Sequence, residues 1–322
     1  MYRSTQTDSI WNWEPLVQIG NHDASDPMPI LSDNGDIYLF FRRAVDGESA
    51  TSVRSLGYIK SSDHGSTWSY FNNIIDNSAG NPNNDDYKWL TTIYNAKVVH
   101  ESADGIYPER FLISWILAGR NADGSGYYDS VHRNVYFAYL NLDDHIMYSA
   151  NQASCGSIVD YNDHMNRCLV FDSGNPNTDE HRIDYITIPS YDLDTNNHLV
   201  AFESQHSTSN AFGINIAVQN GASWTRTNLG QYNAINDLER WDDNRFRIYL
   251  KQSNGNVRPI KTLNGWQTWS TEDEIVAPYE IGNVQLISNP TSAFKGIIKT
   301  YDDLNWANAN YTSGYHNYTF GF

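Results

Sequence analysis

Helical periodicity is almost absent from this chain of 322 residues. Apolar residues instead alternate with polar ones in short runs that Asn, Asp and Gly interrupt, which is typical of an all-β protein. No apolar run approaches the length that a membrane-spanning helix needs, and residues 1–6 lead into no apolar segment of the signal-peptide type. We therefore expect no membrane insertion and no export signal within the chain as given.

Cysteine is also scarce. Cys155 and Cys168 are the only two, and no C-x-x-C spacing indicates a zinc site. Because both fall in one irregular stretch, they predict either a disulfide that closes a loop in an oxidising compartment or two buried free thiols.

Positive charge is low: 21 Lys and Arg face 38 Asp and Glu, which gives a net charge of −17. No basic stripe exists, so nucleic acid is not an expected partner. A polyanion would be repelled at long range, and a cleft that binds one would need local positive potential.

Aromatic residues, in contrast, make up 14% of the chain, with 22 Tyr and 10 Trp. Their abundance favours strands, and it also favours surfaces on which sugar rings stack.

Two groups of residues could hold a structural calcium ion through oxygen ligands, but neither has the twelve-residue pattern of a calcium loop. They are His22, Asp23 and Asp26, and Asp192, Asp194 and Asn196. Acidic turns of this kind are more often only turns, so we expect no metal centre in the site and no required cofactor.

One turn is specified in unusual detail, S-x-D-x-G-x-T-W at residues 61–68. Asp63 can accept hydrogen bonds from backbone N–H groups that follow it, Gly65 permits a positive φ, and Thr67 and Trp68 are expected to start the next strand. Shorter versions, each an Asn-Gly turn leading into a tryptophan, occur at residues 220–224 and 264–269. Recurrence of such turns indicates a repeated antiparallel unit.

The chain divides into five such units, and each opens on a strand, turns at a polar sequence and returns on an aromatic-rich strand. Radial repetition of four-stranded units leaves only short sheet edges exposed. We therefore predict a single all-β domain over residues 1–322, a β-propeller of five blades, with six or seven as alternatives. The predicted blades cover residues 11–76, 87–174, 180–228, 232–270 and 279–322.

Residues 61–68 resemble the Asp box of sialidase-like, BNR-repeat β-propellers, in which this motif is structural. Across most of the chain the order of segments resembles the branch of that family that contains ulvan lyases and related polysaccharide lyases. The segments that carry this resemblance are residues 26–42, 93–139 and 191–224. Asp26 replaces a tyrosine of the family, its histidine pair has no clear counterpart except His22, and the chain is short for the usual seven blades.

The resemblance implies a lyase that cleaves a uronate-containing anionic polysaccharide. Such a reaction removes the proton at C5 and expels the oxygen at C4, which requires a base, an acid and a cation for the carboxylate. The candidate catalytic residues are Arg42 or Arg182 for the carboxylate, His132 or His181 as the base, and Tyr94 as acid or base.

Substrate-binding residues are expected near the start of each opening strand, because these ends gather at the channel of a propeller. The candidates are His22, Asp26, Lys88, Trp89, Arg120, Arg133, Tyr232, Asn233 and Asn283. Each catalytic candidate also has a plainer interpretation: Arg42 as an ion-pairing corner, Tyr94 as core, and His132 and His181 as solvated loop residues.

Two further functions stay open. The first is a glycan-binding propeller without catalysis, such as a receptor-binding or decoration protein of a virion. The second is a sialidase-type hydrolase, although the chain lacks the Phe/Tyr-Arg-Ile-Pro segment and a clean arginine triad. The expected partner is an anionic polysaccharide or a cell-surface glycan. The expected location is extracellular, with a virion surface as the alternative.

Overall fold

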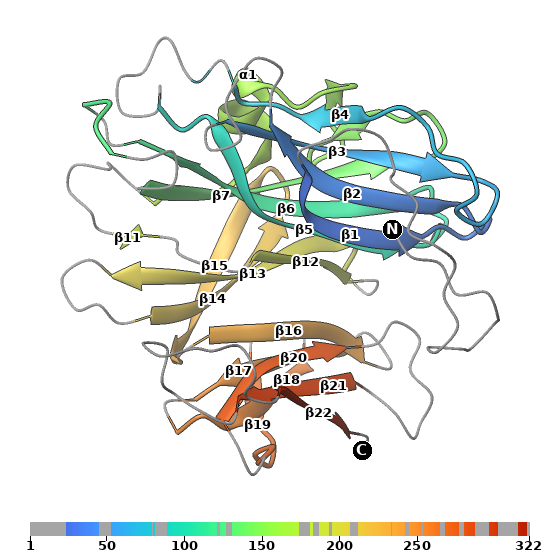
Figure 1. Cartoon of the computed structure of the whole chain (residues 1–322). Coiled ribbons are helices and arrows are strands. Elements are labelled where there is room, and N and C mark those ends of the chain that lie inside the picture. The colour runs from blue at the N-terminus through green and yellow to red at the C-terminus, as the bar shows by residue number, and fades with distance from the viewer. Residues whose placement is uncertain are drawn as a thin grey trace. The chain divides into compact units, whose positions relative to one another are not determined.

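In the computed structural model the chain forms two compact units, residues 1–178 and 179–322. The described residues are 24–44, 53–78, 80, 89–120, 123–126, 131–173, 181–182, 187–192, 195–206, 212–232, 234–241, 245–252, 254–264, 268–276, 280–286, 296–301 and 315–320. Within them, five sheets of antiparallel strands are found (Figure 1). No helix formed by the described residues is long and apolar enough to cross a membrane.

The first sheet is a meander of four consecutive strands. Its strands are β1 (Ala24–Leu31), β2 (Ile37–Ala44), β3 (Arg54–Ser61) and β4 (Asn72–Ile75). Alternation places Tyr38 and Phe40 on one face, in the main core of the unit, and Leu39 and Phe41 on the other face. Trp68 packs on that second face.

The detailed turn at residues 61–68 lies directly after β3. The Asp63 carboxylate accepts hydrogen bonds from the Thr67 N–H at 2.8 Å and from the Thr67 hydroxyl at 2.7 Å. These hydrogen bonds, together with one from Ser61, lower the pKa of Asp63 to about 2. His64 and Gly65 follow with φ of 58° and 85°. Asp63 and Gly65, on which the prediction of this turn depended, therefore have the predicted roles in the structure.

The strand expected from Thr67 starts later, at Asn72. The Lys60 N–H donates to the Ser69 hydroxyl instead of to a backbone carbonyl, and the Trp68 indole N–H donates back to the Gly65 carbonyl. The Ser69 N–H still donates to the Lys60 carbonyl at 2.8 Å, so a side chain replaces only one of the two backbone hydrogen bonds at this pair.

The second sheet is the largest, and it carries the deepest core of the chain's described part. Its strands are β5 (Thr92–Glu101), β6 (Arg110–Gly119), β7 (Val131–Asn141), β8 (Met147–Tyr148), β9 (Ser154–Gly156) and β10 (Leu169–Phe171). All ten residues of β6 are buried. Both faces of this strand are therefore covered, which explains why it reads as a continuous apolar run and not as an alternating one.

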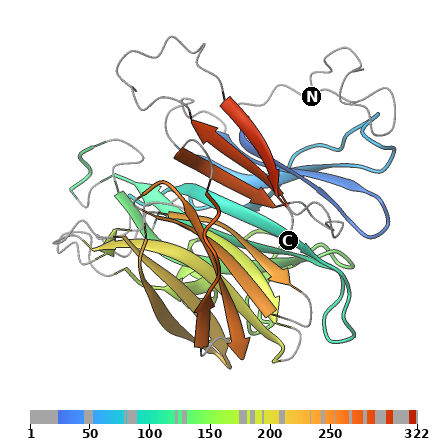
Figure 2. The ribbon, with the colours of Figure 1, turned by 90° about the horizontal axis from the view of Figure 1, so that it is seen from below.

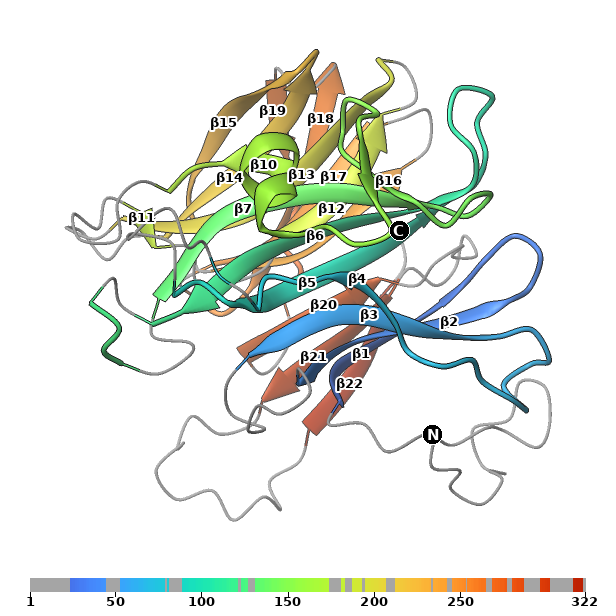
Figure 3. The ribbon, with the colours of Figure 1, turned by 90° about the horizontal axis from the view of Figure 1, so that it is seen from above.

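A short helical segment, α1 (Tyr161–Asp163), continues into a π-helical turn at His164–Cys168 beside β7 (Figure 3). His164 is fully buried, and its ring meets the rings of Trp115 and Tyr136 edge to face at centroid distances of 5.5 and 5.1 Å. Its Nδ1 donates to the Asp160 carbonyl at 2.6 Å. Burial of the imidazole lowers the pKa of His164 to about 4.

The second unit contains the remaining three sheets. The third sheet has β11 (His181–Arg182), β12 (Thr187–Asp192), β13 (Asn197–His206), β14 (Phe212–Asn220) and β15 (Ser223–Gln231). The fourth has β16 (Ala234–Trp241), β17 (Arg245–Lys251), β18 (Val257–Asn264) and β19 (Thr268–Thr271). The fifth has β20 (Glu280–Leu286), β21 (Gly296–Tyr301) and β22 (Tyr315–Phe320).

The third and fourth sheets lie side by side and share one apolar core (Figure 2). Leu199, Ile216 and Phe246 are among its buried members. The Asn220-Gly221 turn is a two-residue hairpin between β14 and β15, in which Asn220 pairs with Ser223 and Gly221 has a φ of 61°. The turn at 265–267 lies outside the described residues. The all-β prediction is confirmed, whereas the division into a single five-bladed domain stays a prediction.

Replacement of Asp63 by Asn should destabilise the protein in a pH-dependent way. The pKa of Asp63 is about 2 in the folded state against an ordinary value of 3.8, so the stabilisation is complete above the ordinary value and is lost as the pH falls through about 2. Urea unfolding of wild type and Asp63→Asn should differ near neutral pH and converge in strong acid. Asp143→Asn, at another exposed turn, is the control, and an equal gap at both pH values would contradict the assignment.

His164 should make the stability of the protein sensitive to mild acid. Its pKa is about 4 in the folded state and 6.5 ordinarily, so the neutral form stabilises the fold above the ordinary value and this stabilisation is lost as the pH falls through about 4. The loss amounts to about 3 kcal/mol. Unfolding of wild type across this window should show a steeper fall in stability than unfolding of His164→Asn. Parallel curves would rule this role out.

Candidate functional site

The first strand of a sheet repeatedly loses its regular pairing near its N-terminal end. Register shifts occur after Ser25 in β1, after Tyr94 in β5, after Ile235 in β16 and after Ile281 in β20. Each shift is a β-bulge with one more residue on the opening strand than on its partner. Bulges re-aim the side chains beside them, and three sequence-predicted site residues, Asp26, Tyr94 and Asn283, lie at these breaks.

In β1 the bulge contains Asp26, whose φ is 55°. Its carboxylate accepts a hydrogen bond from Arg42 Nε at 2.6 Å and also pairs with Arg42 Nη2. The remaining terminal nitrogen of Arg42, Nη1, donates to the Ile93 carbonyl of β5 at 3.0 Å. Arg42 therefore ties the first sheet to the opening strand of the second.

Tyr94 and His132 point to the same face of the second sheet. Thr92 pairs with Ala118 and Ala118 pairs with His132, and Tyr94 lies two residues beyond Thr92. Directly paired residues share a face, as do residues two apart on one strand. Ile116 and Ala118 of β6 share this face, and the rings of Tyr94 and His132 stack at a centroid distance of 4.5 Å with 25° between the planes.

The Arg42 guanidinium also lies over the Tyr94 ring, 4.8 Å from its centroid. Arg42 of β2 and His132 of β7 thus both contact the ring of Tyr94 in β5. His132 is buried, at 7% exposed, whereas Tyr94 is half-buried. We call this arrangement, with Asp26, the Arg–Tyr–His stack.

A second bulge, in β7, fixes the position of His132. Ile116 pairs with Val135 and Leu117 with Arg133, so Asn134 is the extra residue, at a φ of 57°. Its side chain is buried; its amide oxygen accepts from the Ser173 N–H at 2.9 Å, and its amide nitrogen donates to the Tyr136 hydroxyl at 3.0 Å. Asn134 is not among the residues predicted from the sequence, although an asparagine that interrupts an apolar strand is a signal for such a bulge.

Trp89 and Arg120 form a second group at the same end of this sheet, before β5 and after β6. The Arg120 guanidinium is 6.0 Å from the centre of the Trp89 ring, and the Arg120 N–H donates to the Trp89 carbonyl. Gly119 and Gly124 permit this approach, because a Cβ would lie 1.9 Å from the Trp89 carbonyl oxygen at Gly119 and 3.0 Å from the indole at Gly124. Arg120 is exposed, while Trp89 is half-buried.

The remaining predicted residues are described by the strands and cores to which they belong. Arg133 follows His132 in β7, so it points to the opposite face, and it is 1% exposed. Tyr232 packs against the core of the second unit. His181 and Arg182 pair with His206 and Gln205, and Asn283 pairs with Lys299. His22, Lys88 and Asn233 lie outside the described residues, so their roles stay predictions.

The cysteines are buried free thiols whose sulfur atoms are 3.9 Å apart. The hydrogen bond between them lowers the pKa of Cys155 and, together with burial, raises that of Cys168 well above its usual range. Of the residues considered for calcium, Asp192 accepts a hydrogen bond from the Thr195 hydroxyl at 2.8 Å, as in an ordinary turn.

No protein-family model matches the chain, and no curated protein matches it. Among solved structures, the chain is similar to an ulvan lyase of polysaccharide lyase family PL25 bound to -[GlcA(1-4)Rha3S]-. The TM-score is 0.74 at 16% identity, over 99% of this chain and 69% of the lyase. A second structure of a PL25 ulvan lyase matches with a TM-score of 0.73 at 15% identity, over the same shares of both chains. An α-L-arabinanase of Penicillium chrysogenum in complex with arabinobiose matches at a TM-score of 0.50 and 12% identity, over 93% of this chain and 79% of the arabinanase. At sequence identities of 12–16%, these similarities show a shared fold alone.

The Tyr94 ring should hold the stack together independently of its hydroxyl. Tyr94→Ala removes the contacts with Arg42 and His132 and should cost about 2 kcal/mol of unfolding free energy, whereas Tyr94→Phe should stay within about 1 kcal/mol of wild type. Urea unfolding measures both. Tyr70→Ala is the control, since that ring is 95% exposed. Wild-type stability in Tyr94→Ala would show that the ring contributes nothing.

Proposed function

We propose that this chain is a carbohydrate-active β-propeller of five blades that cleaves a uronate-containing anionic polysaccharide by β-elimination. The observation that carries the proposal is the Arg–Tyr–His stack, which brings three independently chosen candidates together at one end of two neighbouring sheets. The fold shared with the ulvan lyase supports it.

Elimination needs two proton transfers at one sugar bond. One group removes the proton at C5, the C4 oxygen leaves with a proton from an acid, and a C4–C5 double bond remains. A tyrosine and a histidine at stacking distance provide both kinds of group within the reach of one sugar ring. We assign these transfers to Tyr94 and His132, with Tyr94, the more exposed of the two, meeting the substrate first.

Arg42 acts on this pair and not as the main clamp for the substrate carboxylate. Asp26 holds Nε and Nη2, and the Ile93 carbonyl takes Nη1. Asp26 therefore occupies the Nε–Nη2 edge that a substrate carboxylate would otherwise pair with, and the Ile93 carbonyl accepts from the other side of the guanidinium. Its cation over the ring face favours negative charge on the Tyr94 oxygen, which a base in the elimination requires.

We assign recognition of the polysaccharide to Trp89 and Arg120. An indole is a platform on which sugar rings stack, and an exposed arginine beside it can pair with a carboxylate or a sulfate. The Arg120 guanidinium provides local positive charge in a protein whose net charge of −17 repels a polyanion at long range. Because such a polymer is too large to enter a cell, we propose that the protein works outside one.

A glycan-binding propeller without catalysis is the second candidate. The observation in its favour is that His132 is 7% exposed beneath Tyr94, and that Arg42 is engaged by Asp26. A site of this kind binds sugar on its aromatic surface without any need for proton transfer.

Incubation with ulvan and other uronate polymers should produce the ultraviolet absorbance of an unsaturated uronate. Tyr94→Phe and His132→Gln should each lower the rate by about 100-fold or more, because a group that transfers a proton is lost while the ring or its volume is kept. His145→Asn, at an exposed turn, should retain the wild-type rate.

Two results would separate the candidates. Absence of absorbance with every polymer, together with retained binding of the same polymers, would overturn the lyase assignment in favour of glycan binding. Elimination that survives both Tyr94→Phe and His132→Gln would keep the activity but place its machinery elsewhere in the chain.

A further inference from the structure

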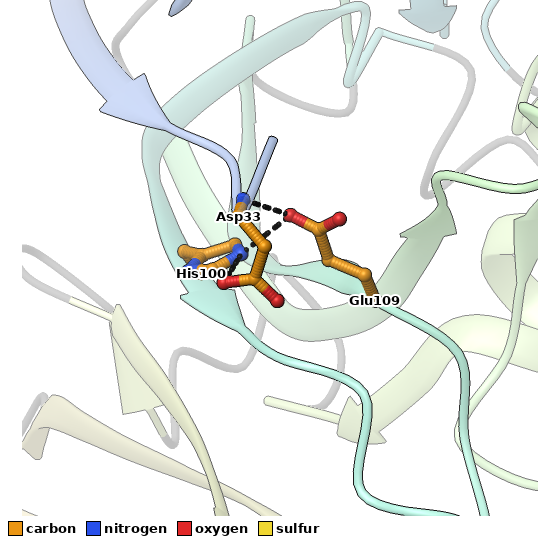
Figure 4. A group of neighbouring side chains, drawn as sticks. All are labelled: Asp33, His100 and Glu109. Atoms are coloured by element: carbon orange, nitrogen blue, oxygen red, sulfur yellow. Dashed lines mark hydrogen bonds and ion pairs between the residues drawn. The ribbon is translucent and has the colours of Figure 1, made fainter. Parts of the chain in front are cut away.

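Three chemically complementary side chains converge at the opposite end of β1 and β5 from the stack: Asp33, His100 and Glu109 (Figure 4). Asp33 begins the turn between β1 and β2, His100 is near the end of β5, and Glu109 directly precedes β6. Their ligand atoms all lie within 4.8 Å of one another. We propose that this group, the Asp–His–Glu cluster, binds a divalent zinc ion.

The distances fit a small tetrahedral ion. His100 Nε2 is 2.8 Å from Glu109 Oε1 and 3.7 Å from Asp33 Oδ1. Ligands at about 2.0–2.1 Å from a tetrahedral zinc ion are about 3.4 Å apart, a value between these two distances. The two distances to His100 therefore lie on either side of the spacing around a tetrahedral zinc ion, and the Asp33 and Glu109 ligand atoms lie within 4.8 Å of each other.

The ligand types select the metal. One imidazole nitrogen and two carboxylate oxygens suit zinc, whereas calcium prefers six to eight oxygen ligands and magnesium a nearly complete octahedron of oxygens. The two carboxylates carry the charge that balances a divalent cation. Asp33 is 49% exposed and provides both an entry path and an open side for a water ligand.

Neighbouring groups already hold the ligands in place. The Ser102 hydroxyl donates to Asp33 Oδ1 at 2.8 Å, and the Asp33 backbone N–H donates to Glu109 Oε1 at 2.6 Å. His100 also packs against the Phe111 ring, with 5.7 Å between centroids. Partners of this kind orient metal ligands and reduce the ordering that binding requires.

A zinc ion here ties two sheets together and takes no part in the proposed elimination. Six residues of extended chain separate Tyr94 from His100, which corresponds to roughly 20 Å along β5. The ion would bridge the β1–β2 turn and the loop between β5 and β6, two connections that belong to different sheets of the first unit.

The test uses the full chain, stripped with a chelator and then titrated with zinc. Metal analysis after gel filtration should find one zinc per wild-type chain, and the melting temperature should rise with zinc concentration because the ion binds only the folded state. His100→Gln and Asp33→Asn should each weaken zinc binding by about tenfold or more. His145→Asn should bind as wild type does, and calcium and magnesium should give much smaller shifts.

Zinc binding of equal strength in wild type and His100→Gln would place any bound ion elsewhere and overturn the proposal. The same conclusion follows if wild type takes up no zinc, in which case the hydrogen bonds among Asp33, His100, Glu109 and Ser102 are what hold the cluster together. The metal-free variants are compared with metal-free wild type by thermal unfolding. Equal melting temperatures of the metal-free proteins would show that lost zinc binding reflects a lost ligand. If metal-free His100→Gln melts at a lower temperature than metal-free wild type, the zinc affinity of Asp33→Asn decides the question.

Discussion

The candidate site depends on the break in pairing near the start of the opening strands. In a regular strand the side chains of β5 would alternate without interruption, so that Val98 would lie on the same face as Thr92 and Tyr94 and on the face opposite to Ile93. The bulge after Tyr94 separates the strand into two parts. The part before it can present Thr92 and Tyr94 toward a polar stack, while the part after it returns Val98 to the core. The bulge thereby resolves a conflict between packing and exposure within a single strand.

Left-handed backbone at these breaks explains why asparagine and aspartate recur there. Asp26, Asn95 and Asn134 all have positive φ, which costs little for residues whose short polar side chains bond locally and much more for branched ones. Asp26 bonds to Arg42, and Asn134 bonds to Ser173 and Tyr136. The residues that form the bulges are thus the ones that hold the neighbouring functional side chains in position.

Alternation, turn chemistry and residue type were readable from the sequence. They predicted the all-β class and the Asp63 turn. They also indicated Arg42 or Arg182, His132 or His181, and Tyr94 as chemically suited residues, and the structure brings Arg42, Tyr94 and His132 into contact. The sequence could not place the bulges, because one extra residue in a strand leaves its apolar pattern nearly unchanged. One interpretation of the sequence placed His132 in a solvated loop, whereas this residue is buried in β7. The Asp33, His100 and Glu109 contacts join residues up to 76 positions apart, and local patterns carry no information on such pairs.

The two ends of the first unit's sheets carry different chemistry because a rigid core separates them. Between the stack and the Asp–His–Glu cluster, β6 is buried on both faces, with Trp115 stacked on Tyr136 at 5.8 Å. A close-packed interior transmits small displacements and resists large ones. The two sheets are joined at both of these ends: Arg42 of the first sheet donates to the Ile93 carbonyl of the second beside the stack. At the other end the Asp33 N–H donates to Glu109, which directly precedes β6. Each site thus lies where a side chain crosses from one sheet to the other, and the buried strands between them keep the two sites apart.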